Sequence, residues 1–91
     1  MSKLDAKFTG TIRKVKDNTV LSDEEYMVFL AKDNAFPATL RFFRDECIRL
    51  GADNEHVQAV NRTIDRLDSY RAANLDKLKV PDVEPDEFLL G

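Results

Sequence analysis

The sequence predicts a small α+β fold, in which an antiparallel sheet at about residues 8–31 packs against an antiparallel helix pair at about 37–50 and 54–73. Three observations lead to it: β-branched residues near the N-terminus, and two apolar stripes at helical spacing further along. The chain has 91 residues, enough for one hydrophobic core and little more. We therefore predict a single domain over residues 1–80, followed by an acidic tail at 81–91.

Residues 8–15 begin the predicted sheet, because β-branched residues are concentrated there. Asp17 and Asn18 have side chains that favour a turn. We therefore expect residues 19–21 to return as the second strand of a hairpin.

Residues 25–31 fit two interpretations. The apolar run in this segment is short and has no 3.6-residue period, which favours a strand buried on both faces. Ser22 followed by Glu25 is a capping-box signature, which favours a helix. We predict a strand at 25–31 with residues 22–24 as its lead-in turn, and a helix over this segment, giving an all-helical fold, is the alternative.

Two amphipathic helices complete the predicted fold. Pro37 suits the first turn of a helix, and Gly51 suits the left-handed residue that ends one. Asp53 or Asn54 can cap a second helix, and the short polar link between the helices predicts antiparallel packing. The apolar stripes, which we expect to be buried, consist of Phe36, Leu40, Phe43, Cys47 and Leu50 in the first helix, and of Val57, Val60, Ile64 and Leu67 in the second.

Composition and charge narrow the function classes. The net charge of −3 argues against a dedicated duplex-DNA binder, which usually carries a basic surplus. A single cysteine excludes an intrachain disulfide and fits a reducing compartment. No apolar run approaches the roughly 20 residues of a membrane span. We expect a cytoplasmic protein without a membrane partner.

No residue pattern indicates catalysis or a cofactor. His56 is the only histidine and has no second ligand at metal-binding spacing, so we expect a solvated helix residue rather than a metal site. Cys47 falls on the apolar stripe, where a buried core thiol is expected rather than a nucleophile. We predict a non-enzymatic protein with no metal or cofactor.

Basic and polar residues gather where the apolar run gives way to the first helix. Free N–H groups at a helix start attract anions, and side chains nearby can add charge and donors. Pro37 removes one of these N–H groups, and no glycine-rich loop is present, so a capped turn with arginines in local ion pairs is the competing interpretation. The residues predicted to bind a negatively charged small ligand are Lys32, Asn34, Arg41 and Arg44.

A second hypothesis is a protein-interaction surface. Phe42 lies off the apolar stripe, so it either packs on the sheet or is exposed to a partner or a second copy of the chain. The tail ends in apolar residues after an acidic stretch, which is compatible with an arm folded on the core or with a short motif that docks on a partner. The predicted interaction residues are Phe42, Phe88, Leu89 and Leu90.

The segments EYMVFLAKDNAFPATLRFF, RLGAD and YRAAN, within residues 25–74, resemble small bacteriophage and prophage proteins of uncharacterised function. The resemblance covers about half of the chain and carries over no functional residue. It implies an accessory protein that acts by binding: blocking a host enzyme, sequestering a signalling nucleotide of host defence, or adjusting transcription. On this basis we expect a counter-defence or regulatory role in the bacterial cytoplasm, with a host protein or an anionic small molecule as partner and with a homo-oligomer as an open alternative to a monomer.

Overall fold

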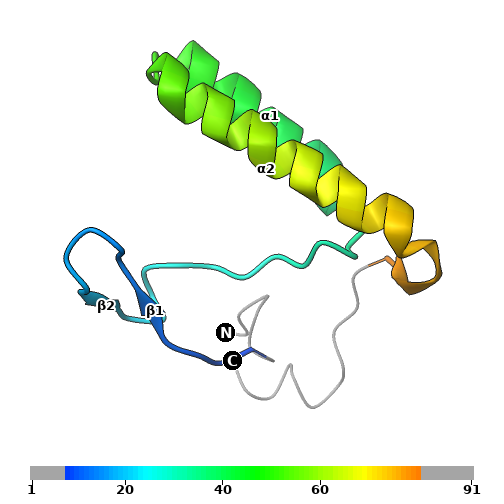
Figure 1. Cartoon of the computed structure of the whole chain (residues 1–91), viewed down its shortest axis with the longest axis horizontal. Coiled ribbons are helices and arrows are strands. Elements are labelled where there is room, and N and C mark those ends of the chain that lie inside the picture. The colour runs from blue at the N-terminus through cyan, green and yellow to red at the C-terminus, as the bar shows by residue number, and fades with distance from the viewer. Residues whose placement is uncertain (1–7, 81–91) are drawn as a thin grey trace. The chain divides into compact units, whose positions relative to one another are not determined.

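A computed structural model describes residues 8–80 of the chain (Figure 1). These residues belong to two compact units, one containing residues 8–29 and the other residues 30–80. A two-stranded antiparallel sheet lies in the first and a pair of helices in the second, which confirms the predicted α+β class. The prediction of a single domain over 1–80 with a tail at 81–91 stays a prediction.

The first unit contains a short β-hairpin. Strand β1 (Ile12–Arg13) pairs antiparallel with β2 (Val20–Leu21), so that Ile12 lies opposite Leu21. Asn18 has a φ of 63°, a left-handed conformation that asparagine tolerates. Hydrogen bonds from the Thr19 hydroxyl and backbone N–H hold the pKa of the Asp17 carboxyl below its usual value. The hairpin and its turn are confirmed, with strands shorter than predicted.

The prediction of a strand at residues 25–31 is wrong. This segment is neither strand nor helix, and the sheet ends at Leu21. The Ser22 N–H does donate to the Glu25 carboxylate at 3.1 Å, as in a capping box, and the Glu25 N–H donates to the Ser22 carbonyl at 3.0 Å, yet only a turn forms. Apolar residues with high β-propensity form a strand only where a neighbouring strand offers a ladder, and the described residues provide none here.

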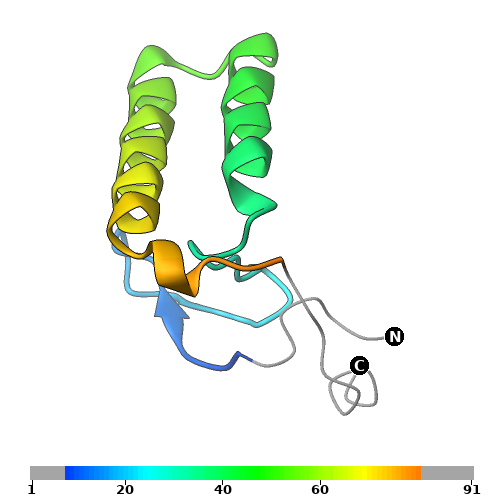
Figure 2. The same ribbon diagram turned by 90° about the vertical axis from the view of Figure 1, so that its right-hand side faces the viewer.

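Both predicted helices are present in the second unit. Helix α1 (Phe36–Arg49) and helix α2 (Asn54–Ala73) lie side by side and antiparallel, joined by a short link at one end (Figures 1 and 2). Gly51 has a φ of 83° just after α1, and the Asp53 carboxylate accepts the His56 N–H at 2.8 Å as the cap of α2. A 3₁₀ turn, η1 (Leu75–Lys77), follows α2.

The core of the helix pair is small and lies on α2. Its buried side chains are Val60, Ile64 and Leu67, three of the four stripe positions predicted for this helix. Helix α1 has no fully buried residue, and the predicted core residue Phe43 is 49% exposed. Phe43 and Leu50 are therefore exposed, against the prediction, whereas Phe36, Leu40 and Cys47 of the same stripe are partly buried. No helix of the described residues is long and apolar enough to cross a membrane.

Candidate functional site

The junction before α1 is a turn organised by Asp33. Its carboxylate accepts the Ala35 N–H at 2.7 Å, and its carbonyl accepts the Phe36 N–H at 3.1 Å. Aspartate commonly bonds the backbone two residues on, which is the local reason for a turn here. No side chain caps α1 itself, and Pro37 occupies its first turn.

The chain that leaves η1 pairs with this junction. The Asn34 N–H donates to the Lys79 carbonyl at 2.9 Å, and the Lys79 N–H donates to the Lys32 carbonyl at 3.1 Å. These bonds make an isolated parallel bridge between Asp33 and Lys79. Backbone groups of the junction are thereby satisfied by a segment far away in the sequence.

Arg71, near the end of α2, also donates hydrogen bonds to the junction. Its guanidinium donates to the carbonyls of Ala31 and Asp33, each at 3.1 Å, and to the Asn34 side-chain oxygen at 2.9 Å. The planar fork of arginine suits several acceptors held in a fixed arrangement. We call this set of bonds the Arg71 clasp. Sequence reasoning did not identify Arg71, because no spacing or motif links it to residues 31–34.

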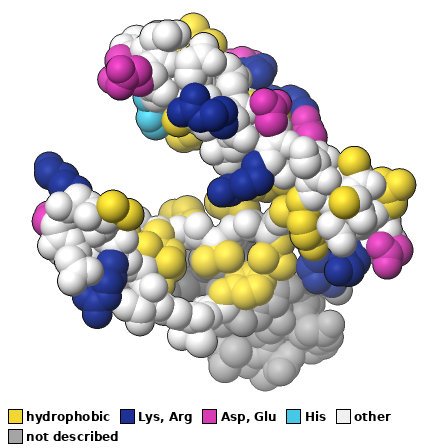
Figure 3. Space-filling view, in the orientation of Figure 1, with side chains coloured by type: hydrophobic (Ala, Val, Ile, Leu, Met, Phe, Trp, Pro, Cys, Tyr) yellow, Lys and Arg dark blue, Asp and Glu magenta, His cyan; other side chains and the backbone are white. Residues whose placement is uncertain are grey.

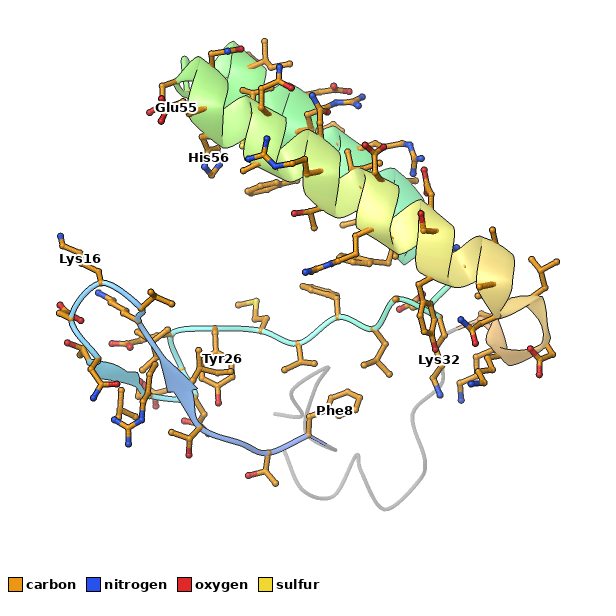
Figure 4. The ribbon with its side chains drawn as sticks, viewed as in Figure 1. Phe8, Lys16, Tyr26, Lys32, Glu55 and His56 are labelled. Carbon is orange, nitrogen blue, oxygen red and sulfur yellow. The ribbon has the colours of Figure 1, made fainter. Side chains whose placement is uncertain are left out.

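The four predicted anion-binding residues do not share one environment. The side chain of Asn34 is part of the Arg71 clasp. Arg41 donates to the Asp68 carboxylate at 2.6 Å and to the Pro37 carbonyl at 3.2 Å. Arg44 donates to Asp45 at 3.2 Å and to Asn61 at 3.4 Å. Lys32 lies at the end of the helix pair opposite His56 (Figure 4). The guanidinium groups of Arg41 and Arg44 thus interact with acceptors on the two helices.

The two candidate catalytic or metal-binding side chains lie on the helix pair. His56 is exposed on α2, as expected, and its ring meets the Phe43 ring edge-on with centroids 6.4 Å apart. Cys47 is partly rather than fully buried. Within residues 8–80, no group of three or more histidine, cysteine, aspartate or glutamate side chains is placed to hold a metal ion.

The two sides of the helix pair differ in chemistry. Arg41 and Phe43 are two residues apart, which places them about 200° apart around α1. The Arg41–Asp68 ion pair lies on one side, and the Phe43–His56 contact lies on the other. Figure 3 shows both hydrophobic side chains and Lys or Arg side chains beside the histidine on the visible face of the helices.

We call the second side the apolar face. On α1 it holds the predicted stripe, whose positions recur at helical spacing. On α2 it holds residues repeated every seven positions, which lie on one line of a helix. The residues of the apolar face are Phe36, Leu40, Phe43, Cys47 and Leu50, from α1 and its C-cap, and His56, Thr63 and Tyr70 from α2, with the exposed Arg66 between the last two.

Phe42 lies on a third surface, the outer side of α1. It is 66% exposed and about 100° around the helix from Phe43. Nearby, Arg49 makes three hydrogen bonds to the Glu46 carboxylate, which raise the pKa of Arg49. The other predicted interaction residues, Phe88, Leu89 and Leu90, lie outside the described residues.

Comparison with protein-family models, with curated proteins and with solved structures finds no match for this chain.

Proposed function

We propose that this chain is a non-catalytic protein-binding module, a phage-type accessory protein that inhibits or modulates a host protein through Phe42 and the C-terminal tail. The observation that carries the proposal is the 66% exposure of Phe42 on a regular helix. An exposed aromatic side chain on a rigid element is typical of the anchor residues that dominate protein interfaces. The Glu46–Arg49 pair beside it would form part of a polar rim.

Replacing Phe42 with alanine tests this proposal. If Phe42 is an anchor, its loss weakens binding of the host partner by about 2 kcal/mol, or about thirtyfold. The measurement is affinity capture from host lysate with the full chain, followed by calorimetry with each captured protein. Ile48→Ala is the matched control, because Ile48 is a similarly exposed apolar residue on another side of the same helix.

Equal affinities of wild type and Phe42→Ala for every captured protein would overturn the role of Phe42. A chain lacking residues 81–91 tests the contribution of the tail in the same way. Loss of the partner with unchanged helicity supports a docking tail, whereas loss of helicity means that the tail is structural.

Our second proposal is that the junction binds a negatively charged small ligand, such as a host-defence signalling nucleotide. Its support is the position of Lys32 beside the start of α1, where an anion is favoured electrostatically. The proposal ranks second because Arg41 and Arg44 already donate to protein acceptors.

Titration calorimetry against a nucleotide panel tests this second proposal. Wild type is expected to bind one of the nucleotides, and Lys32→Ala to bind it at least about tenfold more weakly, which corresponds to loss of one charge-assisted hydrogen bond. Lys16→Ala, in the hairpin, is the control for a change of charge. Absence of heat with every nucleotide would eliminate the junction as an anion site.

A further inference from the structure

We infer that the turn of the β-hairpin is a docking surface for duplex DNA, which it contacts through the sugar-phosphate backbone without reading the base sequence. This surface belongs to the first unit of the structure, so it is distinct from the Phe42 surface and from the junction before α1. The inference goes beyond the proposed function and does not depend on it.

Positive charge is concentrated at the start of the chain. Residues 1–16 contain five lysines or arginines and one acidic residue, whereas acidic residues outnumber basic ones in the rest of the sequence. The net charge of −3 therefore argues against DNA binding by the whole surface, but not against a contact made by this segment. Three of the five cations, Arg13, Lys14 and Lys16, lie in the hairpin.

The hairpin separates its cations from its acidic residues. The Ile12–Leu21 pair forms the base of the ribbon, and the acidic residues at 23–25 come after this base, at the end away from the turn. The one acidic residue within the turn is Asp17, and its carboxylate already accepts the Thr19 N–H at 3.0 Å. The turn is thus the basic end of the ribbon.

The three cations reach both faces and the tip of the ribbon. Lys14 continues the ladder of β1, because its N–H donates to the Thr19 carbonyl at 2.8 Å. Successive side chains of a strand point to opposite faces, so Arg13 and Lys14 present their charges on different faces. Lys16 extends outward from the turn (Figure 4). The guanidinium of Arg13 donates to the Asn18 carbonyl at 3.4 Å, whereas the two lysine side chains make no ion pair with any described residue.

Shape and exposure favour the groove of a duplex over a flat anionic surface. Every residue at 9–20 is exposed, so the protein covers neither face of the ribbon. The major groove of B-DNA is about 12 Å wide and admits a two-stranded β-ribbon, which then has a phosphate backbone on each side. Cations on both faces match this arrangement, and Thr9, Thr11 and Asn18 add side chains of the kind that contact phosphate and sugar oxygens.

Fluorescence anisotropy of a labelled duplex of arbitrary sequence, titrated with the full chain at a series of salt concentrations, tests the inference. Three phosphate contacts predict that log Kobs falls with log[salt] with a slope of at least about 2.7 in magnitude. Lys14→Gln combined with Lys16→Gln is expected to reduce this magnitude by about 1.8 and to weaken binding at low salt at least about tenfold. A second duplex of unrelated sequence should bind equally well.

The matched control removes the same two charges elsewhere. Arg62→Gln combined with Arg66→Gln changes exposed positions of α2, and its DNA affinity and salt slope should equal those of wild type. Lys14→Arg combined with Lys16→Arg keeps both charges in the turn and should also bind like wild type.

Three results would overturn the inference. Absence of duplex binding at low salt is the first, and an equal loss in the two glutamine variants, which would assign binding to net charge, is the second. The third is tighter binding of single-stranded DNA, or of vesicles of anionic phospholipid, than of the duplex, since the fully exposed Val15 at the turn would then serve another partner. Binding of a host protein through Phe42 is measured separately, so the two proposals fail separately.

Discussion

Replacement of Ile64 by alanine is expected to destabilise the helix pair by about 2–5 kcal/mol. Ile64 is 5% exposed and lies between Val60 and Leu67 in the only fully buried cluster of the described residues. The loss combines transfer of the removed atoms to water with the cavity left behind. Small domains have a free energy of unfolding of about 5–15 kcal/mol, so this one change removes a large share of it.

Urea denaturation followed by far-UV circular dichroism measures the effect of Ile64→Ala. The matched control is Leu75→Ala, because Leu75 has a similar volume but is 72% exposed in η1. Its effect should stay within about 0.5 kcal/mol. Equal destabilisation by the two substitutions would mean that the helix pair is not held by its α2 core.

The helices could be predicted from sequence because their signals are local. Pro37, Gly51 and Asp53 set their ends through the backbone of the next few residues, and all three take the positions expected. Local signals could not show whether residues 25–31 form a strand. A strand is completed by hydrogen bonds to another segment, and apolar composition does not reveal whether that segment exists.

The sequence pattern also could not predict how α1 is rotated about its axis relative to α2. Helical spacing shows which residues share a face, but it does not show which face meets the neighbouring helix. Here Arg41 and Arg44 interact with α2 through Asp68 and Asn61, and Phe43 is left partly exposed. Long cationic side chains can line a helix contact with their apolar stems, so charge alone does not assign a residue to the outer surface.

The turn before α1 could be predicted from the sequence, but the contact that Arg71 makes with it could not. Sequence reasoning located the junction at residues 32–34, since a turn residue before a proline-initiated helix is recognisable. It did not find Arg71, whose partners Ala31 and Asn34 are 40 and 37 positions away. Such a contact depends on how the two helices are packed, and no single-sequence signal records it.

Arg71 is the residue whose removal should change the junction most. Arg71→Ala deletes hydrogen bonds to three acceptors at once, and two of these acceptors are part-buried backbone carbonyls. Bonds made by a charged group contribute about 1.5–3 kcal/mol, and an unsatisfied buried carbonyl adds a desolvation cost. We expect a loss of about 2–3 kcal/mol in the free energy of unfolding, measured by urea denaturation.

Hydrogen exchange separates a local role from a general one. If the Arg71 clasp holds the junction, the amides of Asn34 and Lys79 lose protection in Arg71→Ala far more than amides in the middle of α2. Arg71→Lys should restore only part of this protection, because an ammonium cannot present the planar fork. Arg66→Ala removes an exposed arginine from the same helix and should leave both amides protected. Uniform loss of protection across α2 in Arg71→Ala would instead assign this arginine to helix packing, and the junction would then be held by the Asp33 turn and the Lys79 bridge alone.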